Sequence, residues 1–227
     1  MKAFLPWRGG YMARADEVER RFFSGIARDV AHLLGRHLEP LPPTLPPTPR
    51  EPEDILEAYA AELADLAELA EIAELADPAE LDEDQQEPDL PLPPLDNALI
   101  RLLPDMAEDP DMAYELRAIT EESIRTAKVE NLRFFTHSLQ QEAVWVGNED
   151  VRTWAGAAND IRLVLAARLG IHSEETAYQI TEKGWRIIQD TNHQIENSDD
   201  LMCVLYVLLS WWQDSLIRAV QAKKLRG

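Results

Sequence analysis

Two clusters of proline constrain this chain more than any other feature, because they divide it into a body and an insert. Six prolines lie between residues 40 and 49, and four more lie between residues 88 and 94. Proline fixes φ and lacks an amide hydrogen, so segments this rich in it form extended spacers rather than helix or sheet. We therefore expect one helical domain built from residues 1–37 and 98–227, interrupted by proline-rich linkers and an insert over residues 38–97.

The insert holds most of the net charge of the chain. The sequence has 22 Lys and Arg against 42 Asp and Glu, a formal charge of −20, and residues 51–90 contribute 16 acidic residues and no basic one. From Glu62 to Ala76 an acid–Leu/Ile–Ala triplet repeats five times, and these residue types favour helix. Successive acids of the repeat are like-charged i,i+3 neighbours, and each such pair destabilises a helix by about 0.2–0.5 kcal/mol.

A basic surface on a partner would relieve this repulsion, so we interpret the repeat as a partner-binding arm. The acids that would contact the partner are Glu62, Asp65, Glu68, Glu71 and Glu74. The alternative interpretation is a solvated helix that only keeps the protein soluble. The same negative charge argues against a nucleic-acid backbone or an anionic membrane as the main partner.

Outside the insert, apolar residues recur with the period of a helix. Four of the expected helices begin after residues that cap well, which are Asp16, Asn148, Ser173 and Ser198. A short helix from Ala98 ends before Pro104, and a long helix covers about residues 112–140. The inward side of this long helix includes Leu116, Ile119, Ala127, Leu132, Phe135 and Leu139.

Two apolar runs at the N-terminus flank Arg8-Gly9-Gly10, which suits the turn of a small hairpin. Val144–Val146 is a third strand-like piece and a candidate to pair with that hairpin. Gly184 lies inside a predicted helix and suggests the close approach of a neighbouring backbone. The fold class is therefore mainly α: a multi-helix bundle with a small N-terminal β-hairpin and a Pro-flanked acidic helical insert.

Motifs that carry catalysis or metal binding are missing from the sequence. It has no Glu-x-x-His motif, no phosphate-binding glycine loop, no Gly-x-Ser-x-Gly elbow and no histidine pair at metal-ligand spacing. The single cysteine, Cys203, excludes an intramolecular disulfide, and we expect a buried, inert thiol. The densest apolar run, Leu201–Trp212, has 12 residues, short of the roughly 20 that span a bilayer. We expect neither enzyme activity nor a metal, cofactor or membrane anchor.

The candidate binding site in the body is centred on one arginine. Arg162 lies about 40° from the centre of the apolar stripe of its helix, so we expect a half-buried guanidinium. A half-buried arginine favours a carboxylate in a bidentate pair; Asp105 is our first choice, and Glu121 and Glu122 are alternatives. Two interpretations stay open: an ion pair that locks two helices, and a binding site for a ligand or partner. The candidate site residues are Arg162, Asn159, Asp160, Arg101 and Asp105.

Several motifs in the body carry a resemblance to a known family. They are Ala98–Asp105 (ALIRLLPD), Lys128–Leu132 (KVENL), Trp154–Leu165 (WAGAANDIRLVL), Arg168–Ile171 (RLGI) and Trp211–Gln213 (WWQ). Over about residues 98–220, and more loosely over residues 1–37, the chain resembles the actinobacterial domain-of-unknown-function family typified by the oxidative-stress transcriptional regulator AosR. The resemblance implies a cytoplasmic, non-enzymatic regulator that acts through a partner such as a sigma factor. The Cys-x-x-x-Cys pair by which that type of regulator senses oxidation is replaced here by Leu5 and Gly9.

We therefore expect a regulatory protein, of transcription or stress response, that acts through protein–protein contacts and does not bind nucleic acid directly. Its partner presents a basic surface, and a sigma factor is one candidate; a homodimer stays open. The alternative is a sensor of a small anionic ligand, built around Arg162.

Overall fold

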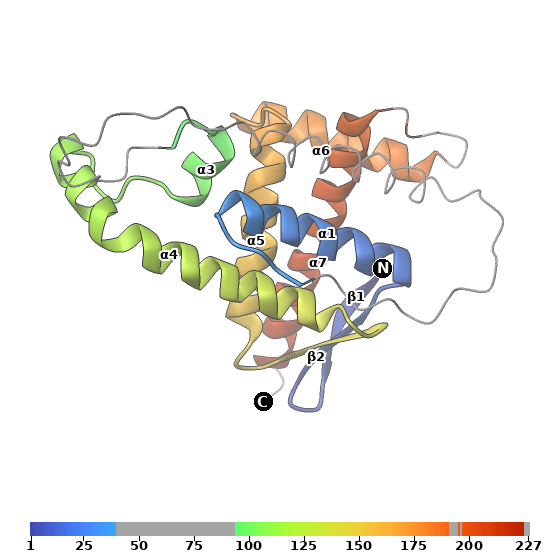
Figure 1. Cartoon of the computed structure of the whole chain (residues 1–227). Helices are drawn as coiled ribbons and strands as arrows, with labels where there is room; N and C mark the ends of the chain where they lie inside the picture. The colour runs from blue at the N-terminus through green and yellow to red at the C-terminus, as the bar shows by residue number, and fades with distance from the viewer. Residues whose placement is uncertain (40–93, 191–194, 196, 225–227) are drawn as a thin grey trace. The chain divides into compact units, whose positions relative to one another are not determined.

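The computed structural model describes residues 1–39, 94–190, 195 and 197–224 (Figure 1). Within these ranges the chain forms three strands and six helices. In chain order they are β1 (Lys2–Trp7), β2 (Gly10–Arg14), α1 (Glu17–Leu33), α3 (Asn97–Leu102), α4 (Pro110–Ser138), β3 (Ala143–Gly147), α5 (Val151–Arg168), α6 (Glu174–Gln189) and α7 (Ser198–Lys224). The described fold is mainly α with a small N-terminal hairpin, as the sequence predicts; the acidic insert lies outside the described residues.

Helix α5 lies at the centre of the described body and packs against α1, α3, α4 and α7. Its Trp154 is fully buried, and its ring centroid lies 5.0 Å from those of Phe4 in β1 and Phe135 in α4 and 5.2 Å from that of Trp212 in α7. The indole N–H of Trp154 also donates to Ser138 Oγ at 3.1 Å, so its polar group is satisfied inside the core. This aromatic cluster ties β1, α4, α5 and α7 together.

The three strands form an antiparallel sheet in the order β1-β2-β3. Val144–Val146 therefore joins the hairpin as its third strand. Gly10 allows the close pairing of β2 and β3, since a Cβ there would lie 2.2 Å from the Val146 carbonyl oxygen. One face of the sheet is buried against the helices, and its side chains are Phe4, Tyr11, Ala13, Val144 and Val146.

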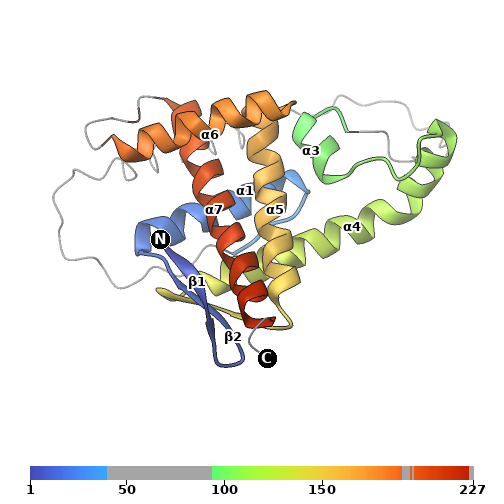
Figure 2. The same ribbon diagram turned by 180° about the vertical axis from the view of Figure 1, so that it is seen from behind.

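Strand β1 packs along α7 and joins residues from the two ends of the chain (Figure 2). The amide of Phe4 donates to Ser215 Oγ at 3.1 Å, and the indole N–H of Trp212 donates to the Lys2 carbonyl at 3.2 Å. Helix α7 is thus attached to the first strand by hydrogen bonds as well as by the aromatic cluster.

Two of the predicted helix caps are present. The Asp16 side chain accepts from the Glu19 amide at 2.9 Å, and the Asp16 amide donates to Glu19 Oε2 at 2.9 Å, which makes a reciprocal capping box. Ser173 accepts from the Thr176 amide at 3.2 Å at the start of α6. Both helices therefore begin where the sequence places them.

The other two caps are predicted one or two residues off. Asn148 still belongs to the end of the sheet, and its side chain accepts from Lys223 Nζ at 2.9 Å; the residue before α5 is Asp150, which makes no side-chain cap. At the start of α7, Asn197 rather than Ser198 accepts from the Asp200 amide, at 2.9 Å. Neighbouring polar residues offer several caps of similar strength, and tertiary contacts choose among them.

The long helix α4 is buried along only part of its length. Leu132, Phe135 and Leu139 are buried as predicted, but Ile119 is 77% exposed and Ala127 is exposed. Figure 1 shows the N-terminal half of α4 extending away from α1 and α5. At 100° per residue, Ile119 lies about 160° around the helix from buried Arg117, and Ala127 lies about 160° from buried Val129. Both residues therefore point away from the covered side of α4, and the prediction for them is wrong.

Helices α6 and α7 meet at Gly184. A Cβ at this position would lie 2.7 Å from Val207 Cγ2 and 2.8 Å from the Cys203 carbonyl oxygen. The predicted close approach of a backbone is therefore confirmed. Cys203 itself is buried, as predicted, and burial raises the pKa of its thiol.

Candidate functional site

Arg162 points from α5 towards α7. Its Nε donates to Ser210 Oγ at 2.9 Å and its Nη1 to Gln213 Oε1 at 2.8 Å, while the guanidinium carbon lies 5.7 Å from the centroid of the Tyr206 ring. Gln213 in turn donates to the Ala155 carbonyl at 2.9 Å. These contacts hold α5 against α7 through neutral groups.

The predicted ion pair of Arg162 is wrong: no described carboxylate lies within ion-pair distance of it, and Asp105 lies elsewhere. Arg162 and Asp105 do not meet because α7 and α3 cover different sides of α5. In Figure 2, α7 lies on one side of α5 and α3 lies on the other, and Asp105 follows α3 in the chain. The sequence identifies Arg162 as half-buried but does not tell which helix covers it.

Asp160 points in another direction, towards α4. Lys128 Nζ lies 2.6 Å from its Oδ1, and the Asp160 side chain is only 5% exposed. Burial raises the pKa of Asp160, and Lys128 offsets this only in part. Asn159 is exposed. Because successive residues of a helix are about 100° apart, Asn159, Asp160 and Arg162 do not converge on one ligand.

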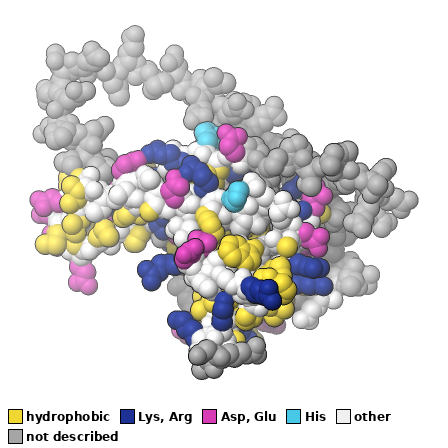
Figure 3. Space-filling view, turned by 90° about the horizontal axis from the view of Figure 1, so that it is seen from below, with side chains coloured by type: hydrophobic (Ala, Val, Ile, Leu, Met, Phe, Trp, Pro, Cys, Tyr) yellow, Lys and Arg dark blue, Asp and Glu magenta, His cyan; other side chains and the backbone are white. Residues whose placement is uncertain are grey.

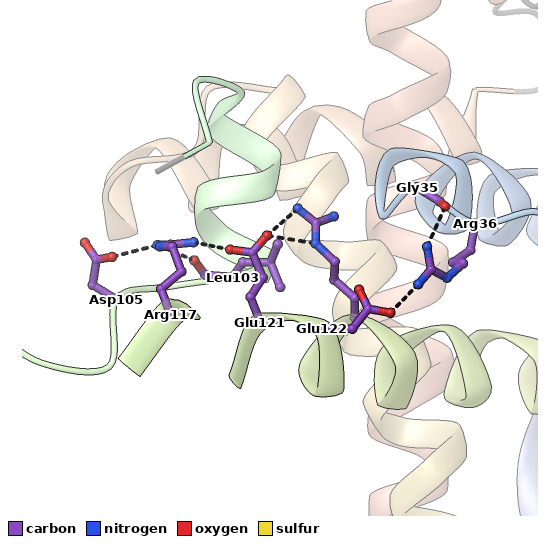
Figure 4. A network of polar contacts seen from close by, with 8 residues as sticks. Gly35, Arg36, Leu103, Asp105, Arg117, Glu121 and Glu122 are labelled. Atoms are coloured by element: carbon purple, nitrogen blue, oxygen red, sulfur yellow. Dashed lines mark hydrogen bonds and ion pairs between the residues drawn. The ribbon is translucent and has the colours of Figure 1, made fainter. Parts of the chain in front are cut away.

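Asp105 belongs to a cluster of charged side chains centred on Arg117 of α4 (Figure 4). Arg117 is 7% exposed; its Nη2 lies 2.6 Å from Asp105 Oδ1, and its Nη1 lies 3.0 Å from Glu121 Oε2. Nη2 also donates to the Leu103 carbonyl at 3.3 Å. Arg125 closes the other side of Glu121 at 2.7 Å. The cluster fastens the segment after α3 to the start of α4.

The electrostatics of this Arg117 cluster favour its charged form. Burial alone would raise the pKa of Glu121, but hydrogen bonds from Arg125 and Arg117 outweigh it and lower that pKa. The signal in the sequence for this cluster is the i,i+4 spacing of Arg117, Glu121 and Arg125, which places the three side chains on one side of the helix. Glu122, the other alternative partner of Arg162, pairs with Arg36 just beyond α1 (Figure 4).

Arg101 makes a fourth, separate set of contacts. It donates to the Ile171 carbonyl, and its Nη2 lies 3.3 Å from His172 Nδ1. It therefore joins α3 to the turn between α5 and α6. The five predicted site residues thus lie in different places, and each charged one among them connects two elements of the body.

Grouped metal ligands do not occur in the described part of the chain, where no three His, Cys, Asp or Glu side chains come together. The rings of His32 and His37 do lie side by side, with centroids 5.3 Å apart. The sequence separates them on a continuous helix, but α1 ends at Leu33, and Gly35, with a φ of +75°, turns the chain back. Among the described residues, no third His, Cys, Asp or Glu lies beside this pair to complete a metal site.

A sequence model of one family, described as a domain of unknown function (DUF2017), matches residues 1–220. The chain belongs to the DUF2017 family. No curated protein and no solved structure matches it. The match confirms that the chain belongs to a domain-of-unknown-function family, and the matched range includes the insert. No described helix of the DUF2017 domain is long and apolar enough to cross a membrane.

Proposed function

We propose that this DUF2017 protein is a non-enzymatic regulator, of transcription or stress response, that acts in the cytoplasm through protein–protein contacts. In this respect it would work like AosR, the regulator that typifies the family it resembles. The partner presents a basic surface, and a sigma factor is the first candidate. The observation that carries the proposal is the charge of residues 51–90, which hold 16 acidic residues and no basic one.

The acidic repeat supports binding to a basic surface. Four like-charged pairs along it cost a helix about 1–2 kcal/mol, and a row of Lys and Arg on a partner would convert that repulsion into attraction. The described body supports a scaffold role, because its buried charges connect its own elements. Lys128 with Asp160, and Arg117 with Asp105 and Glu121, are such connections.

Affinity purification of the tagged full chain from its native cells tests this proposal. A variant in which the five acids of the repeat become amides should lose the partner: Glu62→Gln, Asp65→Asn, Glu68→Gln, Glu71→Gln and Glu74→Gln. A control with the same change of net charge neutralises five exposed glutamates of the body: Glu39, Glu108, Glu115, Glu142 and Glu149. The control should keep the partner, and a partner held equally by both variants would refute the proposal.

One observation favours a second candidate, a sensor of a small anion. The two hydrogen bonds of Arg162 go to neutral groups, so no described carboxylate neutralises its charge. Phosphate, sulfate and citrate, added singly in thermal unfolding, should then raise the Tm of wild type and not of Arg162→Gln. Arg152→Gln, an exposed position on the same helix, serves as the control. Equal effects of the anions on all three proteins would rule out this candidate.

A further inference from the structure

The outer face of the sheet carries large apolar side chains where an antiparallel sheet that faces water normally carries polar ones. Alternation along the strands places Leu5, Trp7 and Trp145 opposite the buried face, and they are 65%, 56% and 48% exposed. Leu5 pairs with Met12 in register, and Met12 pairs with Trp145. An apolar row therefore crosses all three strands, with Trp7 beside it.

The same face is basic. Lys2 and Arg14 lie directly opposite each other in β1 and β2, an arrangement in which like charges repel. Arg8 is exposed in the turn that joins these strands. No described carboxylate lies within ion-pair distance of these three side chains. The exposed acids near the strands in sequence are Asp16, whose side chain caps α1, and Glu142 and Glu149 at the two ends of β3. Seen from below, the molecule shows hydrophobic side chains among Lys and Arg (Figure 3).

We infer that this outer sheet face, made of Leu5, Trp7, Met12, Trp145, Lys2, Arg8 and Arg14, binds an acidic segment of a partner protein that also presents apolar side chains. Exposed tryptophans that become buried are typical centres of binding energy in protein interfaces. The unpaired Lys2, Arg8 and Arg14 would attract carboxylates and orient the segment. This surface shares no residue with the acidic repeat, so the inference adds a second contact to the proposed function and does not depend on it.

A protein segment fits this face better than a nucleic acid or an anionic membrane does. Both of those are extended arrays of negative charge, and the chain as a whole carries −20. The net negative charge of the chain repels an extended anionic array over a Debye length of about 10 Å. A short acidic segment contacts only the basic face and avoids most of this repulsion.

Fluorescence anisotropy with the full chain tests the inference. The probe is a fluorescein-labelled 16-residue peptide that repeats Glu-Leu-Asp-Phe, and the control peptide has Lys in place of every acid. We expect Leu5→Ser with Trp145→Ser, and separately Arg8→Glu with Arg14→Glu, to weaken binding of the acidic probe at least tenfold. Higher salt should weaken binding to wild type, and the Lys peptide should not bind.

Matched controls remove an apolar side chain and a charge elsewhere. Ile119→Ser changes an exposed residue of α4, and Arg186→Glu changes an exposed arginine of α6. Both should bind the probe within twofold of wild type, and circular dichroism should show all variants folded.

Several outcomes would overturn the inference. The first is equal binding of the acidic probe by the sheet variants and by wild type. Wild type could instead bind phosphatidylserine vesicles or single-stranded DNA. If the sheet variants lost that binding, the face would belong to a membrane or a nucleic acid. Loss of a dimer in light scattering of the sheet variants would assign it to a second copy of this chain. Tighter probe binding after deletion of residues 51–90 would assign it to the chain's own acidic segment.

Discussion

Gly184→Ala is the sharpest test of the packing between α6 and α7. In a helix with open surroundings this change stabilises a protein, because glycine has the larger conformational entropy to lose on folding. At position 184 the new methyl group would meet Val207 Cγ2 at 2.7 Å and the Cys203 carbonyl oxygen at 2.8 Å. Val207 is a side chain and has some freedom to move, but the carbonyl belongs to the backbone of α7 and does not.

The overpacking is the larger of the two effects. The gain from helix propensity is about 0.5–1 kcal/mol, and the overpacking costs about 1–3 kcal/mol. We therefore expect a net loss of up to about 2.5 kcal/mol, which lowers the Tm of a chain of this size by up to about 10 °C. Gly25→Ala in α1 is the matched control, because a Cβ there has only Arg28 Nη2 near it, at 3.9 Å.

Thermal unfolding followed by circular dichroism at 222 nm measures both variants. Gly25→Ala should raise the Tm, and Gly184→Ala should lower it. Gly184→Ala should cost less in a Val207→Ala background than in wild type, but it should still lower the Tm there, since the carbonyl contact remains. If Gly184→Ala raised the Tm as much as Gly25→Ala does, the two helices would not be in the contact described, and the reasoning would fail.

Three further predictions concern buried polar groups. Arg117→Met should destabilise by about 3 kcal/mol in urea unfolding, because it removes the donor to the Leu103 carbonyl and leaves Glu121 with Arg125 alone. Arg186→Met on the surface should change stability by less than about 0.5 kcal/mol. Burial raises the pKa of Asp160 above 3.8, so the folded state binds that proton more tightly than the unfolded chain does. The contribution of Asp160 to stability therefore falls as pH rises from 3.8 through the raised pKa. Urea unfolding at a series of pH values from acidic to neutral should show wild type losing stability relative to Asp160→Asn. Cys203 should react with a thiol reagent many times more slowly in the native protein than in urea, because it is buried and burial raises the pKa of its thiol. A flat pH dependence, or equal rates with and without urea, would contradict the second or third prediction.

Local signals explain most of what could be predicted. The Arg8-Gly9-Gly10 turn, the Asp16 and Ser173 caps and the glycine at 184 each depend on a few neighbouring residues, and a sequence shows those directly. Helix content follows from the period of apolar residues, which tertiary packing reinforces rather than opposes. These features fix the class of the fold.

Long-range choices could not be predicted in the same way. The half-buried position of Arg162 follows from the helical wheel, but its partners on α7 depend on which helix covers that side of α5. Asp105 pairs with Arg117, which is only 12 residues away in the chain, and not with the distant Arg162. Ile119 is apolar but lies on the side of α4 away from buried Arg117, and the sequence does not show which side of α4 the other elements cover.

The attachment of β1 to α7 bears on how this protein is made in the cell. Phe4 and Ser215 are 211 residues apart, and translation delivers the first of them long before the second. During synthesis the aromatic side of the hairpin stays uncovered, since the helix that shields it has not yet left the ribosome. Docking of β1 on α7 therefore waits for the synthesis of α7 and is slow relative to formation of the helices, as is usual when native contacts are distant in sequence. Nascent chains stalled before residue 212 should consequently depend on chaperones that shield apolar surface.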